Sequence, residues 1–293
     1  MTTYDLRPLS LGEILDRTFS LYRNHFVLFA GITAIPYMLI LVAGLAQVLF
    51  VKVPNVGRIQ SGAPQLQASG VSAGDAGFAV LIGLAVLVVA GVAHLLAQGA
   101  TVFAVSELHL GRTTTIGAAL QRVRGELGTL FGVLILSSLA IGGGLILLII
   151  PGIYIACRLA VCVPAAILED LGPRTSLERS WALTKDNAGR ALLIYVLYFV
   201  LVIVVTLLFK WPFAVLAVLN VKDPNTFRFW LAAQQVGNFA GDVLVGPFVT
   251  IATSLLYYDL RVRKEAFDLQ MMMGALGGTP ARPVTGGAPS MFS

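Results

Sequence analysis

The sequence has few charged residues. Only 12% of its 293 residues are Asp, Glu, Lys or Arg, whereas an ordinary soluble domain carries about 25%. Hydrophobic residues make up 57% of the chain. So few charges cannot cover the surface of a water-soluble globule of this size. The composition therefore excludes a disordered chain, a disulfide-rich secreted module and a cytosolic enzyme fold, and it predicts an all-α polytopic membrane protein.

Residues for catalysis and for metal binding are also scarce. The two cysteines, Cys157 and Cys162, lie five residues apart in one apolar run, where they read as small core residues. The chain has three histidines and no HExxH, GxSxG or GxxxxGK[ST] motif. Asp242 and Asp259 are 17 residues apart, about 25 Å on one helix, so they cannot share a proton. We therefore expect no enzyme activity, no cofactor and no metal site.

The net charge of +5 is distributed as membrane topology requires. The basic residues form short clusters beside apolar runs, which argues against nucleic acid as a partner. The first 25 residues are polar or amphipathic, and the apolar run after them is too long for the apolar core of a signal peptide. No cleaved signal is therefore expected.

Six segments are long and apolar enough to span a bilayer, for which about 20 residues are needed. Pro151-Gly152 separates the third segment from the fourth, either as a tight turn or as a kink in one helix. The 41 residues of 128–168 suffice for two crossings and are far more than one crossing needs, which favours six spans. The predicted spans are 26–51, 78–106, 128–149, 152–168, 191–210 and 232–258.

The Lys and Arg residues predict the orientation of these spans. With both termini in the cytoplasm, 14 of the 20 lie inside, five lie outside and Arg158 lies within a span. The five outside are Lys52, Arg58, Lys210, Lys222 and Arg228. Residues 1–269 form one integral membrane domain in this interpretation, with a flexible outer loop at 52–76. Residues 270–293 form a disordered cytoplasmic tail, its composition most biased from about 274 onward.

Three similar segments precede pairs of spans: SLGEILDR (10–17), TIGAALQR (115–122) and SLERSWAL (176–183). Each begins with Ser or Thr, and Ser10 with Glu13 forms a capping box. Apolar residues follow a helical period, with basic residues on the other face, as in helices that lie in the membrane interface. The chain is interpreted as about three interfacial amphipathic helices on the cytoplasmic side, each followed by a transmembrane hairpin. The alternative, that any loop between spans becomes basic and amphipathic, stays open.

Ionisable residues inside a span are functional candidates because they are costly there. Arg158 and Asp242 each lie about 10 Å inward on helices that run from outside to inside. The hypothesis is an intramembrane Arg158–Asp242 ion pair of structural role, and the alternative is a polar pathway. His94 and Gln98 form an i, i+4 pair that favours an interhelical hydrogen bond. Gly237 and Gly241 form a GxxxG motif that permits close helix approach.

Several motifs together resemble a known bacterial family. They are RPLSLGEILDRTFSLYRNHF (7–26), IPGIYIACRLAVCVPAAILED (150–170), LERSWALTKDNAGR (177–190) and YYDLRVRKEAFDL (257–269). Over residues 7–269 the chain resembles the membrane domain of glycerophosphoryl diester phosphodiesterase, related to six-span YciC-type bacterial proteins. This resemblance implies a multi-pass protein of the bacterial cytoplasmic membrane. Some relatives are fused to a soluble phosphodiesterase barrel, for which the 34 residues after Asp259 leave no room.

The inner face holds most of the remaining candidates. Cationic clusters there attract anionic lipid, and Trp181 suits the headgroup level. The candidate lipid or ion-pair contacts are Arg17, Arg122, Glu169, Arg179, Trp181, Asp259 and Arg261. We expect an ion-pair network that ties interfacial helices to span ends, with ordinary solvated charges as the alternative. The leading hypothesis is a non-enzymatic protein that binds membrane lipids, a protein partner or a second copy of itself. The other is a small-solute transporter or channel that uses Arg158 and Asp242.

Overall fold

The computed structural model describes residues 9–50 and 73–265, and every regular element in these ranges is helical. The part of the predicted outer loop at 52–72 and the predicted tail at 270–293 lie outside the described residues. The elements are α1 (Leu11–Asn24), α2 (Phe26–Phe50), α3 (Ala73–His109), α4 (Ile116–Arg124), α5 (Leu127–Leu147), α6 (Ile149–Arg158), α7 (Cys162–Leu168), α8 (Pro173–Leu183), α9 (Ala188–Val205), the π-helix η2 (Thr206–Lys210), α10 (Trp211–Leu219) and α11 (Pro224–Glu265).

Six helices are long and apolar enough to cross a membrane, as the sequence predicts. They are Phe26–Leu49, Val80–His109, Leu127–Leu147, Ile149–Leu168, Ala188–Leu219 and Pro224–Glu265. The chain is thus an all-α, multi-pass membrane protein. The fifth helix runs past the predicted end at 210 to Leu219. Nine more helical residues, the apolar run 211–219, therefore follow Lys210, where the predicted span ends.

Short helices precede each pair of long ones, in the order that the three segments predict: α1, α4 and α8. The capping box of α1 is confirmed, since Ser10 Oγ accepts a hydrogen bond from the Glu13 backbone N–H and Glu13 accepts one from the Ser10 N–H. Thr115 Oγ1 caps α4 by accepting from the Ala118 N–H, but Ala118 has no side-chain acceptor to complete a capping box. The third helix begins instead with Pro173 in its first turn.

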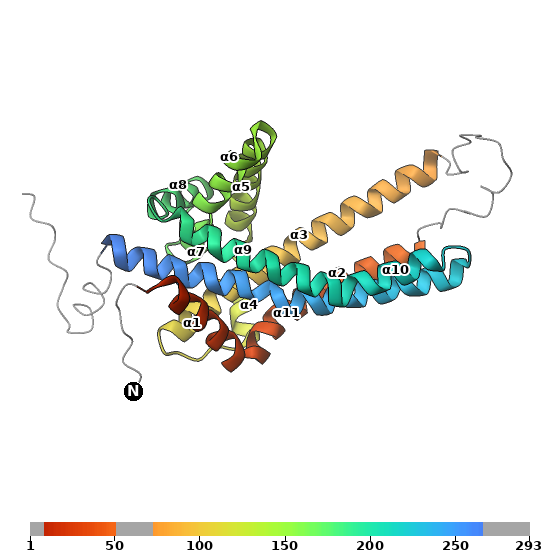
Figure 1. Cartoon of the computed structure of the whole chain (residues 1–293), viewed down its shortest axis with the longest axis horizontal. Coiled ribbons are helices and arrows are strands. Elements are labelled where there is room, and N and C mark those ends of the chain that lie inside the picture. Colours follow the sequence, from red (N-terminus) through yellow and green to blue (C-terminus); the bar gives the residue numbers. More distant parts are fainter. Residues whose placement is uncertain (1–8, 51–72, 266–293) are drawn as a thin grey trace, which may run out of the picture.

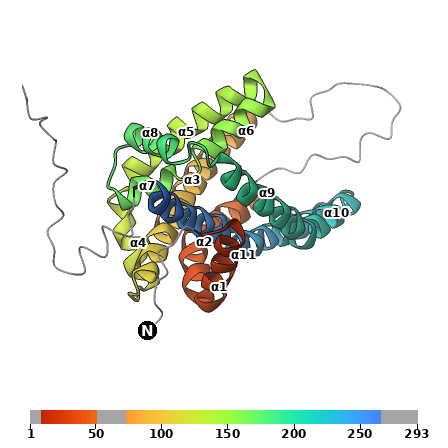
Figure 2. The same ribbon diagram turned by 60° about the vertical axis from the view of Figure 1, so that its left-hand side comes forward.

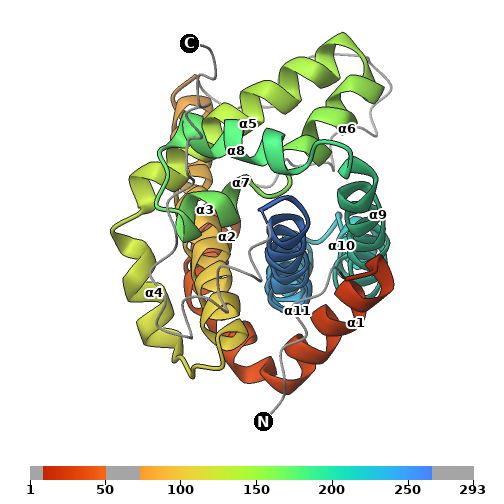
Figure 3. The same cartoon turned by 90° about the vertical axis from the view of Figure 1, so that its left-hand side faces the viewer.

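Helix α11 runs through the middle of the molecule. Its 42 residues reach about 63 Å, twice the hydrocarbon thickness of about 30 Å. In Figure 3 it is seen end-on, with α2 and α3 on one side and α9 and α10 on the other. Its C-terminal half carries the core: Ile251, Leu256 and Tyr257 are fully buried. Contacts from α2, α3, α9 and α1 surround it, and α2, α9 and α11 lie lengthwise in Figure 1.

The boundary between α5 and α6 is a tight turn, which resolves the alternatives at Pro151-Gly152. The single extended residue Leu148 joins the two helices, and Pro151 falls in the first turn of α6, where it needs no N–H partner. A Cβ on Gly144 would lie 2.9 Å from the Cα of Gly152. Glycine at these positions therefore lets the two helices meet directly behind the turn.

Candidate functional site

The ion pair inside the bundle joins Lys210 to Asp242. Lys210 Nζ donates to Asp242 Oδ1 at 2.9 Å, and the side chains are 27% and 41% exposed. Asp242 lies near the middle of α11, and Lys210 ends the π-helix between α9 and α10. An isolated charge at the centre of a bilayer costs about 2.5–3.5 kcal/mol on insertion scales, and a partner of opposite charge lowers that cost.

The π-helix places Lys210 against α11. Pro212 lacks an N–H, so the helix cannot continue its regular ladder into α10, and the Trp211 N–H bonds to the Thr206 carbonyl, five residues back. The same distortion pushes the Phe209 carbonyl toward α11, where a Cβ on Gly237 would lie 2.0 Å from it. A Cβ on Gly241 would likewise lie only 2.6 Å from Val205 Cγ1. The predicted close approach at the GxxxG motif is therefore confirmed.

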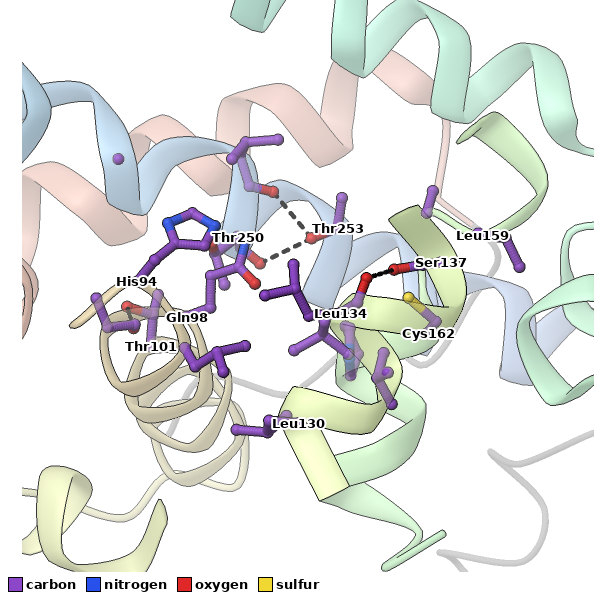
Figure 4. Close-up of a pocket in the computed structure, with 18 of the residues that line it drawn as sticks. His94, Gln98, Thr101, Leu130, Leu134, Ser137, Leu159, Cys162, Thr250 and Thr253 are labelled. Carbon is purple, nitrogen blue, oxygen red and sulfur yellow. Dashed lines mark hydrogen bonds between the residues drawn. The ribbon is translucent and has the colours of Figure 1, made fainter. Parts of the chain in front are cut away.

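A cavity of about 360 Å³ lies next to this pair, where α5 and α7 meet α2, α3, α9 and α11. Apolar side chains, among them Leu130, Leu134 and Leu159, form part of its wall, and polar uncharged side chains form the rest. Figure 4 shows both kinds facing the same space. The polar group comprises Thr33, Tyr37, His94, Gln98, Thr101, Ser137, Tyr195, Tyr198, Thr250 and Thr253. None of the described residues that line this cavity is an Asp, Glu, Lys or Arg.

Four hydroxyl groups of the cavity are arranged as acceptors. Thr101 Oγ1 donates its proton to the Ala97 carbonyl at 2.7 Å, and Thr253 Oγ1 donates to Val249 at 2.9 Å. Thr33 and Ser137 bond in the same way to their own helices. A hydroxyl has one proton, so each of these oxygens keeps its lone pairs for another partner. The cavity therefore suits a ligand with an apolar body and hydrogen-bond donors.

A smaller cavity of about 50 Å³ adjoins the first, and both are lined by Tyr37, Tyr198 and Gly246. Lys210 and Asp242 line the smaller one. Tyr37 Oη lies 3.1 Å from His94 Nδ1, which is the interhelical hydrogen bond expected of His94. Polar groups thus follow one another from the ion pair to the larger cavity.

Arg158 has other neighbours than the predicted one. Its guanidinium lies 4.5 Å from the centre of the Trp181 ring and 5.9 Å from that of Tyr154. The residue is 5% exposed, and its buried Nε has no hydrogen-bond partner. Among the ion pairs of the described residues, none joins Arg158 to Asp242. Arg158 instead makes a cation–π contact with α8, and Asp242 pairs with Lys210. The predicted pair does not form because α6 ends at Arg158 beneath α8 and not beside α11.

The backbone beside Arg158 is fixed by α8. Ser180 Oγ and Thr184 Oγ1 both donate to the Arg158 carbonyl, at 2.9 and 2.8 Å. These bonds satisfy a carbonyl at the C-terminus of α6, where the helix has no partner of its own. Trp181, on the same helix, meets Tyr154 edge-on with ring centres 6.2 Å apart.

Inner-face candidates do form ion pairs. Glu169 accepts two bonds from the guanidinium of Arg179, at 2.8 and 2.9 Å, and one from Tyr257 Oη at 2.6 Å. Arg261 lies 3.9 Å from Glu169 and bonds to Glu265 at 3.0 Å. Burial raises the pKa of Glu169, but the hydrogen bonds from Arg179 and Tyr257 and the charges of Arg179 and Arg261 together hold that pKa below its ordinary value.

Asp259 holds Leu9, which precedes α1, against α11. Its side chain is fully buried and accepts bonds from the Leu9 N–H at 2.7 Å, from Arg190 and from Arg263. The Leu9 carbonyl accepts from both arginines, at 3.1 and 2.7 Å. The predicted tie between an interfacial helix and span ends is therefore present at this point.

Two further candidates lie nearer the surface. Arg122, on α4, is 3.4 Å from both Glu126 and Asp170, and its side chain is 48% exposed. Arg17 lies on α1 and is half-buried. Pairs as exposed as those of Arg122 contribute at most about 1 kcal/mol.

Residues 130–272 match a family model described as the membrane domain of glycerophosphoryl diester phosphodiesterase. This part of the chain is similar to that family. Most of the site residues lie within the matched range of the membrane-domain family, including Arg158, Lys210 and Asp242. The cavity, however, also draws on Tyr37 and His94, which precede the matched range. No curated protein and no solved structure matches the chain.

Lys210 and the shared tyrosines were missed by reasoning from the sequence. A signal was present for Lys210, because apolar residues continue for nine positions after it, which is unusual for a residue at a span end. For Tyr37 and Tyr198 the sequence offers no signal, since their positions toward the cavities depend on how α2 and α9 pack on α11.

Proposed function

We propose that this protein is a non-enzymatic membrane protein that binds one amphipathic lipid-like molecule between its helices. The observation that carries the proposal is the cavity of about 360 Å³ with mixed apolar and acceptor lining. Its volume falls within the usual range of ligand sites, about 300–1,000 Å³. Its lining favours an apolar chain together with hydroxyl or amine donors.

The cellular location belongs to the same proposal. We place the protein in the bacterial cytoplasmic membrane, with the end that holds Leu9 and the C-terminus of α11 in the cytoplasm. Support comes from the charges, since Arg179, Arg190, Arg261 and Arg263 gather at that end and positive residues favour the cytoplasmic side. Anionic lipids are the expected neighbours of these residues.

A matched pair of variants tests ligand binding. Ser137 lines the cavity, whereas Ser138 is exposed on the outside of the same helix. Ser137→Leu fills part of the cavity and removes an acceptor; Ser138→Leu makes the same change away from it. The protein is purified in mild detergent, and retained lipids are identified by native mass spectrometry.

One lipid species is expected at about one copy per chain in the wild type and in the S138L variant. The S137L variant is expected to lose it roughly ten-fold, equivalent to about 1.4 kcal/mol. Equal retention of the same lipid by both variants, or retention of none by the wild type, contradicts the proposal.

A second candidate, a solute pathway, is favoured by the two adjoining cavities and by the Lys210–Asp242 pair beside them. Thr206 lines the smaller cavity. If solute crosses here, a Thr206→Cys variant is expected to react with small membrane-impermeant thiol reagents added from either face. Reaction from one face alone, or from neither, argues against a pathway.

A further inference from the structure

The α5–α6 hairpin exposes a continuous apolar surface around its turn. From Leu127 to Cys157 no residue is charged. The five residues 146–150, around the turn, are each between 67% and 89% exposed. A helix that is apolar on every side belongs either in a protein core or in lipid, and this hairpin has no core around its tip.

The direction of the hairpin separates it from the other long helices. In Figure 3, α2, α3, α9 and α11 are seen end-on, whereas α5 and α6 are seen along their length. Figures 1 and 2 agree: the hairpin leaves the side of the bundle and runs across it. Length and composition qualify six helices as spans, but the hairpin and the other four do not run in the same direction.

The base of the hairpin is fixed by close contacts at one end of the bundle. A Cβ on Gly132 would lie 2.5 Å from Pro173, so α5 packs tightly against the start of α8. At the end of the other helix of the hairpin, α6, Ser180 and Thr184 of α8 donate hydrogen bonds to the Arg158 carbonyl. The short helix α8 also bonds to the C-terminus of α11, through Lys264 Nζ and the Ala182 carbonyl at 2.8 Å. The crosswise direction is therefore built into the fold.

The side chains of the turn suit an apolar solvent. It has no polar side chain between residues 145 and 153, whereas the turn between α10 and α11 is Asn220-Val221-Lys222-Asp223. The Leu148 N–H bonds to the Gly144 carbonyl at 3.0 Å, and the Gly152 N–H bonds to the Leu148 carbonyl at 3.3 Å. These two bonds pair four of the backbone groups at the turn, and pairing of this kind is favoured in lipid.

We infer that the α5–α6 hairpin lies within a single leaflet, the one on the side of α1, α4 and α8, with its tip among the acyl chains. A helix is about 10–12 Å across and a leaflet holds about 15 Å of hydrocarbon, so a helix lying across the bundle fits. The surface that contacts lipid is continuous with that of α9, against which α6 packs. The hairpin occupies area in one leaflet only and forms the cavity wall on that side.

Single-cysteine labelling tests this placement. The native Cys157 and Cys162 are buried, so the wild type serves as the control without an accessible cysteine. A membrane-impermeant maleimide is added to cells and to inverted vesicles that carry Lys222→Cys, Arg112→Cys or Leu148→Cys. Lys222 and Arg112 are exposed in the α10–α11 and α3–α4 turns, so they report the two faces.

The K222C and R112C variants are expected to react from opposite faces, and L148C from neither. Reaction of L148C from the face of K222C means that the hairpin crosses the bilayer, and reaction from the face of R112C means that it lies in water. Either result overturns the inference.

A second measurement identifies what covers the tip. A permeant fluorophore on L148C is expected to be quenched severalfold by lipids with nitroxides on their acyl chains. An unquenched fluorophore means that a second copy or another protein covers the hairpin, which also overturns the inference. Neither measurement depends on whether the cavity binds a ligand.

Discussion

Lys210 Nζ lies 2.9 Å from Asp242 Oδ1, and this pair joins the π-helix to the middle of α11. Removing either charge leaves the other at depth without a partner. We expect Lys210→Met and Asp242→Asn each to lower the free energy of unfolding by about 2 kcal/mol. The double variant Lys210→Met/Asp242→Leu is expected to regain most of that loss. Thermal unfolding in lipid nanodiscs provides the measurement, and strictly additive losses would show that the two residues are not coupled.

The approach of α11 to the π-helix depends on the absence of a side chain at Gly237. An added Cβ would meet the Phe209 carbonyl at 2.0 Å. Gly237→Ala is therefore expected to cost about 1–3 kcal/mol of stability. Gly91→Ala is the control, because nothing lies within 4 Å of a Cβ there, and alanine is the better helix former. Similar melting temperatures for the two variants would contradict the close contact.

Acid is expected to weaken the inner-face cluster around Glu169. Its pKa is lower in the folded protein than its ordinary value of about 4.3, so the unfolded chain binds more protons near that pH. The stabilisation is thus complete at neutral pH and is lost as the pH falls from about 5 through the folded pKa.

The corresponding measurement is the melting temperature from pH 6 to pH 3. Glu169→Gln is expected to flatten its decline, whereas Glu178→Gln, at an exposed pair with Arg174, should leave the decline unchanged. Parallel curves for the wild type and E169Q would count against this assignment.

The buried carboxylate of Asp259 is expected to be the most sensitive residue of the inner face. Asp259→Asn leaves Arg190 and Arg263 together without their anion and weakens the hold on Leu9. A loss of about 3 kcal/mol is expected. The exposed Asp16 on α1 is the control, since its change to Asn should stay within about 0.5 kcal/mol. Chemical unfolding in detergent compares the two, and equal effects would contradict a special role.

Much of the fold can be predicted from the sequence because long apolar runs and capping residues act locally. The Ser10–Glu13 capping box and the order of short and long helices follow from neighbouring residues alone. The direction of the α5–α6 hairpin does not, since it depends on contacts such as Gly132 with Pro173. Hydropathy reports the length of a helix and carries no information about its direction.

The candidate site was predicted only in part. Asp242 was chosen as a residue that pairs with a cation, and it pairs with Lys210, but depth along a helix could not select between Arg158 and Lys210. The choice depends on the π-helix, which Pro212 produces, and on where α6 ends. Glu169, Arg179, Asp259 and Arg261 were found because charges that flank spans have few other partners.

The proposed ligand is tested most directly by a crystal structure grown from a lipid phase. Continuous density is expected in the cavity between Ser137 and Thr250, with its polar end close to the acceptor oxygens of Thr101 or Thr253. A cavity that is filled by water alone, or closed by inward movement of α5, would contradict ligand binding in the cavity.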